Sequence, residues 1–451
     1  MMQVTTTLQA YERIGVLGLG LTGLSAARFL LGHGLSPVLM DTRAESVQKL
    51  QAEPALAACE QYLGALDLEA LLSLDLVIMS PGLAFKDPAL LMARDAGVEF
   101  ISDIELFARL VRVPVIGVTG SNGKSTVVSL VTHMLRECGR DVGLGGNIGT
   151  PALDLFSAEH DCMVLELSSF QLEQTHSLNL AAATVLNISA DHMDRYPSLD
   201  AYALTKNRIY RRAEVLVFNR DDKRTLPSRV RALQHTVSFG LQDDDQNFAL
   251  ELQGGDEFIC FNGQPLVATQ RLSLPGEYNK ANVMASLALV AALGVDLERA
   301  AQAATSFQAL KHRCQLVKDA KHVRWINDSK ATNIGAAAAA VEGLRADVTG
   351  KLILIAGGDA KGADLNELKP VLAQVDELIT LGKDGPAIAA LKAGSHQVSS
   401  MSQAVKKAAS LASKGSLVLL SPACASLDMF NDYQQRGDVF IAAVEAVHGV
   451  T

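Results

Sequence analysis

The stretch GVTGSNGKST, at residues 117–126, places glycines before a lysine and two hydroxyl side chains, a pattern typical of triphosphate binding. Glycines let backbone N–H groups turn toward phosphate oxygens, and Lys124 adds a mobile positive charge. The hydroxyl of Ser125 or Thr126 can bind Mg²⁺ at the start of the following helix. Val118 stands where the strict G-x-x-x-x-G-K-[ST] motif has its first glycine. We therefore interpret the stretch as a variant phosphate loop and predict that the chain uses ATP.

Two further groups that could do chemistry follow apolar runs. Glu166 ends such a run in VLELSSFQLE, where a carboxylate can hold Mg²⁺ directly or through water. His192 follows another run, in NISADHMDRYP at residues 187–197. On residue types alone, a surface acid and a structural histidine remain open alternatives. Lys206, in the helix-like stretch ALTKNRIY, is by the same reasoning a surface lysine whose stem packs on the protein.

A second glycine-rich stretch, GLGLTG at residues 18–23, follows the first apolar run and opens a helix-like segment. Asp41 ends the next strand-like run. Together they fit a dinucleotide site, but a lone G-x-G-x-x-G is a weak signal, and the same fold holds the diphosphate of many ligands, UDP-sugars included. NAD and a UDP-linked ligand both stay open on these residues.

Polar residues gather again in the second half of the chain. Asn279 and Asn282 stand at a helix start, where both can face one ligand. A basic group, Lys311-His312-Arg313, lies where a closing domain would bring positive charge to ATP. Three more polar loops follow strand-like runs, at residues 327–333, 357–361 and 421–428. Because parallel strands end at one edge of a sheet, we predict a ligand site at these loops.

The elements that must position these residues alternate between strand-like and helix-like runs, which predicts an α/β fold with parallel sheets. A polar stretch over about 235–275 departs from this pattern and predicts an antiparallel appendage. We place domain boundaries near 102 and 309, giving domains 1–102, 103–309 and 310–451. The predicted strands are 14–17, 38–40, 76–79, 113–118, 163–165, 184–188, 215–218, 352–356, 377–381 and 416–420.

Length and composition fit a multidomain enzyme. At 451 residues the chain is too long for one ordinary core, and ~150 residues per domain suggests about three domains. With 49% apolar and 20% charged residues, the composition favours an α/β enzyme over a disordered or fibrous chain. The net charge is −9 and basic runs are no longer than pairs such as Arg211-Arg212, so we predict no nucleic-acid partner.

Cysteines and apolar runs bear on the compartment. The six cysteines are scattered without a C-x-x-C motif and are expected to be reduced. The first 20 residues lack a basic region followed by an apolar run, so we expect no secretory signal. The longest apolar run, at 283–295, is 13 residues, short of the ~20 that a membrane span needs. We expect a cytoplasmic protein with no membrane partner.

Taken together, the motifs resemble those of the Mur ligases of peptidoglycan synthesis, over nearly the whole chain and in the family's order. The match is closest to the members that add D-glutamate to UDP-N-acetylmuramoyl-L-alanine. The alternatives are another Mur-type ligase, folylpolyglutamate synthase, an NAD-dependent dehydrogenase and a non-catalytic nucleotide-binding regulator. The matching motifs are GLGLTGLS, SPG, GVTGSNGKST, GGNIG, LELSSFQLE, DHMDRYP, NDSKATN, GGDAK and LSPACASLD.

The resemblance implies a Rossmann-like first domain that binds UDP rather than NAD, a central P-loop ATPase domain with a small antiparallel β appendage, and a C-terminal Rossmann-like α/β domain that binds the amino acid. The implied UDP-substrate residues are Leu21, Thr22, Asp41, Thr42, Arg43, Ser80, Gly82, Asn147, Ser168 and Gln171. Those for ATP are Gly120, Asn122, Gly123, Lys124, Ser125, Thr126, Asn279, Asn282, Arg313, Asp328 and Lys330. Those for D-glutamate are Thr332, Lys361, Ser426, Leu427 and Tyr433, the last standing where a phenylalanine is common.

The resemblance further implies ATP as co-substrate with two Mg²⁺ ions. Lys124, Glu166, His192 and Lys206 would be catalytic. The metal ligands would be Ser125, Glu166, His192 and Lys206, the lysine as a carbamate formed with CO₂. The expected reaction passes through an acyl phosphate, sheltered from water by a closing third domain, and contributes to cell-wall biogenesis, cell shape and cell division. We expect a monomer.

Overall fold

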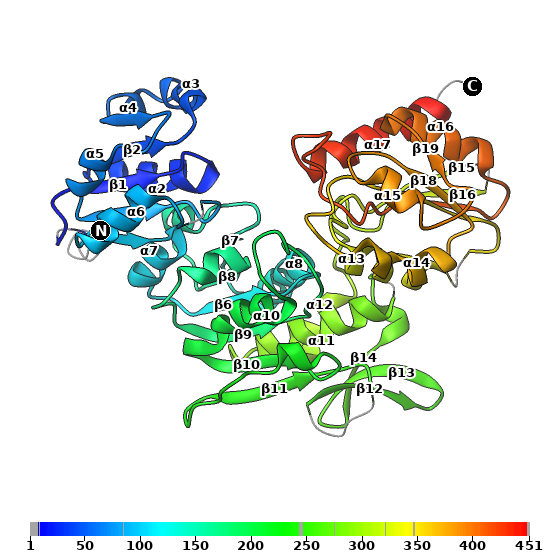
Figure 1. Ribbon diagram of the computed structural model, residues 1–451. Coiled ribbons are helices and arrows are strands. Elements are labelled where there is room, and N and C mark those ends of the chain that lie inside the picture. Colours follow the sequence, from blue (N-terminus) through cyan, green and yellow to red (C-terminus); the bar gives the residue numbers. More distant parts are fainter. Residues whose placement is uncertain are drawn as a thin grey trace.

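The structure is a computed structural model that describes residues 8, 10–83, 85–242, 247–274, 276–320, 322–345 and 348–448. Most of the chain's first ten residues, on which the expected absence of a secretory signal partly rests, lie outside the described residues. The described chain forms three sheets with helices packed around them, in the order first, central and third along the sequence (Figure 1). No described helix is long and apolar enough to cross a membrane.

The first sheet has the strand order β3-β2-β1-β4-β5, and its four pairings are parallel. Its strands are short and buried at the centre, as expected where helices cover both faces. The strands are β1 (Ile14–Leu17), β2 (Val38–Asp41), β3 (Gln61–Leu63), β4 (Leu76–Met79) and β5 (Glu99–Ile101). The helical segments are α2 (Leu21–Gly32), η1 (Ala44–Ser46), α3 (Val47–Gln51), α4 (Pro54–Ala57), α5 (Leu68–Leu72), α6 (Pro88–Asp95) and α7 (Asp103–Leu110).

The central sheet has nine strands in the order β14-β13-β12-β11-β10-β9-β6-β8-β7. Pairing is parallel from β7 to β12 and antiparallel from β12 to β14. The strands are β6 (Val115–Thr119), β7 (Val142–Gly146), β8 (Cys162–Glu166), β9 (Leu180–Val185), β10 (Ala213–Asn219), β11 (His235–Phe239), β12 (Phe248–Gln253), β13 (Asp256–Phe261) and β14 (Gln264–Ala268).

Helices α8 (Lys124–Glu137), α11 (Glu277–Ala291) and α12 (Leu297–Ala304) pack against one another beside this sheet. Their apolar side chains share one buried cluster with β6 and β8, which holds the loop before α8 in place. The other helical segments of this region are η2 (Ala152–Ser157), α9 (Ser169–Glu173), α10 (Leu199–Asn207), η3 (Arg208–Arg212), η4 (Lys223–Thr225) and η5 (Thr269–Arg271).

The third sheet has the order β15-β16-β20-β17-β18-β19, parallel except for the antiparallel edge strand β15. The strands are β15 (Gln315–Ala320), β16 (Val323–Asn327), β17 (Leu352–Ala356), β18 (Glu377–Thr380), β19 (His396–Gln397) and β20 (Leu417–Leu420). The helical segments are α13 (Ile334–Arg345), η6 (Leu365–Leu368), α14 (Lys369–Ala373), α15 (Gly385–Ala389), α16 (Met401–Leu411) and α17 (Tyr433–His448).

Two sequence predictions need correction. The strand predicted at 184–188 is β9, which begins earlier and ends at Val185, because the alanine-rich residues before it pair between β6 and β10. The antiparallel appendage predicted over about 235–275 is only partly right: β12 to β14 are antiparallel, but β11 pairs parallel with β10 and continues the central sheet. Residues 243–246 and 275 of that stretch lie outside the described residues. The domain boundaries at 102 and 309 stay predictions.

Candidate active site

The loop between β6 and α8 turns on two glycines with positive φ, Gly120 at +144° and Gly123 at +83°. A Cβ at position 123 would lie 2.5 Å from the Tyr278 hydroxyl oxygen and 2.7 Å from Asn282 Oδ1. Both contacts come from the start of α11, where Asn282 also donates to Asn279 Oδ1 over 3.2 Å. Glycine is therefore required at position 123 by conformation and by space.

Lys124 lies at the start of α8 with its amino group folded back over this loop. Its Nζ donates to the carbonyl oxygens of Gly120, over 2.8 Å, and of Ser121, over 2.7 Å. Desolvation lowers the pKa of Lys124, although the carboxylates of Glu166 and Asp191 oppose the shift. Phosphate oxygens entering the loop would replace these two carbonyl acceptors and give the ammonium group of Lys124 a negatively charged partner.

Glu166, the last residue of β8, holds its carboxylate between two donors. Ser125 Oγ donates to Glu166 Oε2 and Asn147 Nδ2 donates to Oε1, each over 2.7 Å. Burial raises the pKa of Glu166, but the attraction of Lys124 and these two hydrogen bonds outweigh it, so that the pKa lies below its ordinary value. The buried carboxylate is therefore ionised and lies beside the first hydroxyl of α8.

His192 and Asp191 follow β9, and Asp191 meets the third domain. Asp191 forms an ion pair with Lys361 Nζ, and its Oδ2 accepts from Asn333 Nδ2 over 3.4 Å. His192 Nε2 lies 3.8 Å from Asp191 Oδ2, and the ring packs on Phe170 with centroids 4.8 Å apart. Burial lowers the pKa of His192 to about 4 despite the opposing effect of Asp191. The imidazole is thus neutral near pH 7 and can act as a metal ligand.

Lys206 is 1% exposed, so the surface position expected from its residue type alone is wrong. It lies in α10 with Nζ 3.4 Å from Thr119 Oγ1 and 4.7 Å from the centroid of the Tyr202 ring. Burial, followed by repulsion from Lys124, lowers the pKa of Lys206 well below its ordinary value. The lowered pKa favours the neutral, nucleophilic form of this amine.

The third domain contributes a second group of charges. Lys330 Nζ lies 3.8 Å from the centroid of the Tyr433 ring, and burial lowers the pKa of Lys330 to about 7. Asp328 accepts from Ser421 Oγ over 2.8 Å and from the backbone N–H of Cys314 over 3.2 Å. Burial raises the pKa of Asp328 to about 6 in spite of these bonds. Such shifts are typical of functional sites.

These groups meet around a cavity of about 320 Å³ between the central and third sheets, a size suited to a small-molecule ligand. It lies where the carboxyl ends of the central parallel strands face those of the third sheet. The predicted residues that line it are Asn122, Gly123, Lys124, Ser125, Asn147, Glu166, His192, Arg313, Lys330, Thr332, Lys361, Ser426, Leu427 and Tyr433.

Five lining residues were not singled out from the sequence: Ser121, Asp191, Asn333, Ala425 and Asp432. Asn333 and Ala425 lie in two of the polar loops that were predicted to form a ligand site. Asn333 Nδ2 donates to Asn122 Oδ1 over 3.0 Å, so this amide joins the third domain to the phosphate loop. The only sequence feature that pointed to Asn333 was its position in the polar loop NDSKATN. Its contact with Asn122, across the two domains, is visible only in the structure. Predicted residues near the cavity but not lining it are Gly120, Thr126, Lys206, Asn279, Asn282 and Asp328.

The predicted UDP-substrate residues form a separate group on the first sheet. Asp41 is buried and accepts the backbone N–H of Leu19 over 2.7 Å and that of Arg43 over 2.9 Å. Ser80 lies against Gly18, where an added Cβ would come within 2.8 Å of the serine Cβ. The cavity of about 320 Å³ is lined by none of the seven first-domain residues Leu21, Thr22, Asp41, Thr42, Arg43, Ser80 and Gly82.

Ser168 and Gln171 form a capping box at the start of α9. The Gln171 backbone N–H donates to Ser168 Oγ over 3.2 Å, and the Ser168 N–H donates to Gln171 Oε1 over 3.0 Å. These mutual bonds give both side chains a role in starting the helix. Their predicted contact with the UDP substrate stays a prediction.

The described side chains fit Mg²⁺ only in part. Among the residues that the structure describes, no group of three or more His, Cys, Asp or Glu side chains could hold a metal by itself. Ser125 Oγ and the ionised Glu166 nevertheless give two adjacent oxygen donors beside the phosphate loop. Mg²⁺ is commonly held by one or two carboxylates together with water and substrate phosphates, so this donor pair fits a metal that arrives with a nucleotide.

Comparison with known proteins covers nearly the whole chain. The N-terminal domain family "Mur ligase MurD-like" matches residues 12–102, "Mur ligase middle domain" matches 118–290, and "Mur ligase, glutamate ligase domain" matches 312–424. A protein of Shewanella oneidensis named UDP-N-acetylmuramoylalanine--D-glutamate ligase is 48% identical over 443 residues, which is 96% of this chain and 98% of that protein.

Two solved structures share the fold. UDP-N-acetylmuramate-alanine ligase MurC from Thermotoga maritima aligns with a TM-score of 0.62 and 18% identity, covering 96% of this chain and 99% of that one. MurF ligase from Thermotoga maritima, in complex with ADP, aligns with a TM-score of 0.63 and 16% identity, covering 91% and 96%. At these identities the likeness concerns the fold, and it confirms the predicted three-domain α/β architecture.

Proposed function

Since this chain belongs to the Mur ligase family, we propose that it joins D-glutamate to UDP-N-acetylmuramoyl-L-alanine while converting ATP to ADP and phosphate. The protein then serves cytoplasmic synthesis of peptidoglycan precursors, acting as a monomer. The relative that is 48% identical over almost the full length of both chains carries this proposal. The charged cavity, in which a phosphate loop faces the third domain, supports it independently.

The first chemical step activates a carboxylate, which is a poor electrophile as it stands. The terminal carboxylate of UDP-N-acetylmuramoyl-L-alanine attacks the γ-phosphorus of ATP, so that an acyl phosphate forms and ADP leaves. Lys124, Arg313 and Lys330 line the cavity and would neutralise charge on the transferring phosphoryl group. Asn147, Ser168 and Gln171 would lie on the muramoyl side, and Asn279, Asn282 and Asp328 would contact the nucleotide.

The second step forms the amide. The amine of D-glutamate attacks the acyl carbon, and the tetrahedral intermediate collapses with loss of phosphate and a proton. Lys361 would bind the γ-carboxylate of the amino acid, taking it in exchange for Asp191, its present partner. Thr332, Ser426, Leu427 and Tyr433 would complete the amino-acid pocket. Because water would hydrolyse the acyl phosphate, the contact of Asn333 with Asn122 would help keep the cavity closed.

Mg²⁺, when bound with ATP, supplies positive charge to the phosphates. Ser125 and Glu166 would hold one ion, and His192 with a carbamylated Lys206 would contribute to a second. A carbamate forms when the neutral Nζ attacks the carbon of CO₂ and loses a proton, which converts a buried cation into an anionic ligand. The lowered pKa of Lys206 favours the neutral amine that this reaction requires.

The first domain would bind the UDP portion of the substrate. Leu21 and Thr22 begin α2, and Thr42 and Arg43 follow β2, so that they surround the carboxyl ends of β1 and β2. This is the place where Rossmann-like sheets bind nucleotides. Ser80 and Gly82 follow β4, the other neighbour of β1, and would complete the diphosphate site.

The test is ADP release with MgATP, UDP-N-acetylmuramoyl-L-alanine and D-glutamate, omitting each in turn and replacing D-glutamate with L-glutamate or other amino acids. Release that requires all three substrates and the D isomer is expected. Turnover with a different amino acid would keep the mechanism but reject the proposed substrate. ATP binding without turnover would favour a nucleotide-binding regulator, and binding of NAD by calorimetry would favour a dehydrogenase.

A further inference from the structure

Two segments far from the cavity lie side by side on the central domain: η3, which precedes β10, and the connection that precedes β11. Gln234 Nε2 donates to the carbonyl oxygens of Tyr210, over 2.9 Å, and of Ala213, over 2.7 Å. β10 and β11 are parallel, with Val215 opposite His235. The residues just before each strand therefore leave the same edge of the sheet.

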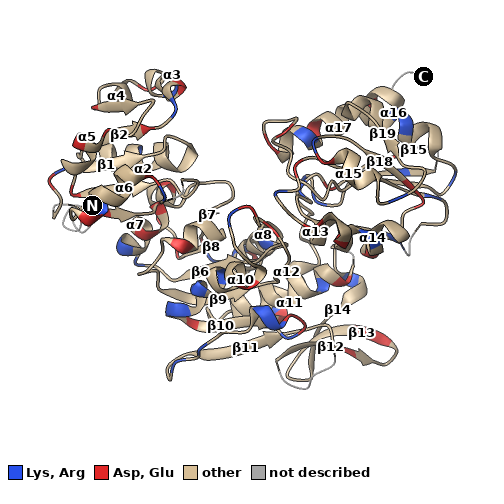
Figure 2. Cartoon of the chain, viewed as in Figure 1, with Lys and Arg blue, Asp and Glu red and all other residues tan. Residues whose placement is uncertain are grey.

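This edge carries a concentration of positive charge. Between positions 223 and 235 the chain has four basic residues and no acidic one, although the whole protein has a net charge of −9. Arg211, Arg212, Arg229 and Arg231 are all exposed. Among the residues that the structure describes, no ion pair joins Arg211, Arg212, Arg229 or Arg231 to an acidic side chain, whereas Arg224 pairs with Asp200. Figure 2 shows basic residues along this side of the central domain, near β10 and β11.

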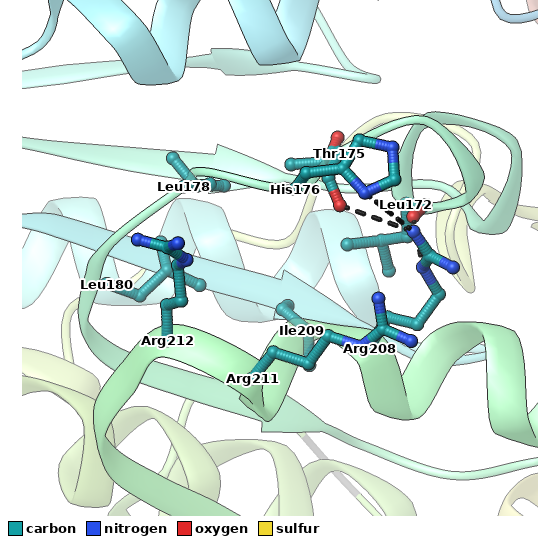
Figure 3. A pocket seen from close by; sticks show the side chains of 9 residues that line it. All are labelled: Leu172, Thr175, His176, Leu178, Leu180, Arg208, Ile209, Arg211 and Arg212. Carbon is teal, nitrogen blue, oxygen red and sulfur yellow. Dashed lines mark hydrogen bonds between the residues drawn. The ribbon is translucent and has the colours of Figure 1, made fainter.

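Arg208 adds a fifth guanidinium at the base of this surface. It lines a small cavity of about 10 Å³ with Arg211, Arg212 and His176. In Figure 3 the side chain of Arg211 lies beside that of Arg208, whereas Arg212 points to the other side of the cavity, next to Leu180. Its Nε donates to the Leu172 carbonyl oxygen over 2.7 Å, which fixes its position. Burial and then repulsion from Arg211 lower the pKa of Arg208. The cluster thus brings positively charged guanidinium groups together, and an anion bound from outside would stabilise them.

Apolar side chains project from the same connection. Leu226 is 42% exposed, Val230 48% and Leu233 89%. Most of the large apolar side chains that the structure describes are buried. Three exposed ones in one eight-residue segment, interleaved with Arg229 and Arg231, therefore form an amphipathic surface. In Figure 1 the connection before β11 projects beyond the sheet, away from the third domain.

We propose that this arginine patch, made of Arg208, Arg211, Arg212, Arg229 and Arg231 with Leu226, Val230 and Leu233, docks the protein on an anionic lipid surface. The arginines bind the headgroups and Leu233 enters the acyl boundary. A projecting loop suits insertion into a bilayer better than it suits a packed protein interface, whose apolar residues fill pockets. Nucleic acid is disfavoured because the patch has no aromatic side chain on which bases could stack.

The patch leaves the catalytic cavity free. The cavity lies beyond the carboxyl ends of the central parallel strands, whereas the patch precedes the amino ends of β10 and β11. Substrates can therefore enter while the protein is docked. The sequence prediction of no membrane partner rested on the longest apolar run, which is too short to span a bilayer. Run length bears on a membrane span and not on a surface patch that two separate segments form together.

The experiment is co-sedimentation of the full-length protein with vesicles of phosphatidylcholine alone or mixed with phosphatidylglycerol. We expect binding only to the anionic vesicles, weakening as NaCl is raised. The double variant Arg211→Ser/Arg212→Ser should bind roughly fivefold more weakly for each arginine removed. Leu233→Ser should reduce the binding that persists at high salt, because that part comes from insertion.

The matched control is Lys406→Ser/Lys414→Ser, which removes the same charge from exposed positions on the third domain. It should bind anionic vesicles as the unchanged protein does. The proposal would be overturned if the control lost as much vesicle binding as the arginine variant. It would also be overturned if the protein did not bind anionic vesicles at low salt, and the patch would then suit an acidic protein as its partner. ADP release measured alongside should be unchanged in every variant, so this result is independent of the proposed reaction.

Discussion

The molecule contains two glycine loops that begin alike and differ in their surroundings. Each follows a buried parallel strand and leads into a helix: the first, at residues 18–23, runs into the start of α2, and the second, at 120–123, precedes α8. Around the first loop the acidic group is already satisfied, since Asp41 accepts hydrogen bonds from Leu19 and Arg43. Around the second loop, several charged groups lie together and titrate far from their ordinary pKa values.

This difference separates binding from catalysis. A site whose groups are mutually satisfied offers shape and a few fixed hydrogen bonds, which suits recognition of a substrate portion that does not react. In the second site no described ion pair holds the amino group of Lys124, Lys206 or Lys330, although the carboxylates of Glu166 and Asp191 lie in the same cavity. An anionic ligand would give these amino groups the direct partner that they do not have. The glycine motif is common to both, so the chemistry depends on what the other strand ends bring to each loop.

The largest effect should come from Lys206→Ala, which removes a buried group of the second loop's surroundings. We expect ADP release to fall by about 10²–10³-fold, as for other groups that stabilise transition-state charge, with partial rescue by added formate or acetate. Rescue would mean that the added carboxylate occupies the place of the carbamate group of Lys206. Lys280→Ala, at a lysine that pairs with Glu257 outside the cavity, is the control. A fully active Lys206→Ala enzyme would reject the carbamate role.

Lys361→Ala should have the next largest effect and should separate the ligands within the cavity. Loss of a hydrogen bond to a charged group predicts a KM for D-glutamate raised roughly 10- to 100-fold, with the KM for ATP nearly unchanged. Steady-state kinetics with each substrate varied in turn is the measurement. Lys383→Ala serves as the control, because that exposed lysine pairs with Asp359 in the same domain. An unchanged KM for D-glutamate would remove Lys361 from the pocket.

A matched pair of glycine substitutions compares the loops directly. Gly123→Ala places a Cβ 2.5 Å from the Tyr278 hydroxyl at a φ of +83°, so we expect it to lower the free energy of unfolding by about 1–3 kcal/mol. Gly20→Ala, in the first loop, meets nothing within 4 Å and should be nearly neutral. Urea unfolding of both variants measures this, and equal destabilisation would mean that the second loop is no more constrained than the first.

The smallest effect should be a pH dependence in the first loop. Burial raises the pKa of Asp41, but hydrogen bonds from Arg43 and Leu19 outweigh it and bring the pKa to about 2, against an ordinary 3.8. A lowered carboxylate pKa stabilises the fold above pH 3.8, and this contribution disappears as the pH falls toward 2.

Asp41→Asn should therefore be less stable than the unchanged protein at neutral pH, and the difference should shrink between about pH 4 and pH 2. Thermal unfolding at a series of pH values in that window measures it. A difference that stays constant across the window would show that the Asp41 charge does not stabilise the loop.

Local patterns in the sequence were enough to predict many elements. The strands predicted at 14–17, 76–79 and 352–356 match β1, β4 and β17 in full, because each is a short apolar run bounded by polar turns. β9 was displaced because its residues 181–183 are alanines, which carry little strand preference and form a strand here through their pairing with β6 and β10.

The candidate site divides in the same way. Fourteen of the predicted site residues line one cavity, since polar loops that follow parallel strands collect at one edge of each sheet. The bond of Asn333 to Asn122 and the ion pair of Asp191 with Lys361 were beyond sequence reasoning. Both pairs join residues of different domains, and no local spacing encodes such contacts.

The sequence by itself determined the glycine loops, the strand ends and the residue types available for chemistry, because turn conformation and strand preference depend on near neighbours. Only the tertiary structure decided that Lys206 is buried, that His192 is neutral, and that Arg211 and Arg212 lie beside the loop of Arg229 and Arg231. Burial and Coulomb interaction act through space, and they bring together residues that lie far apart in the chain.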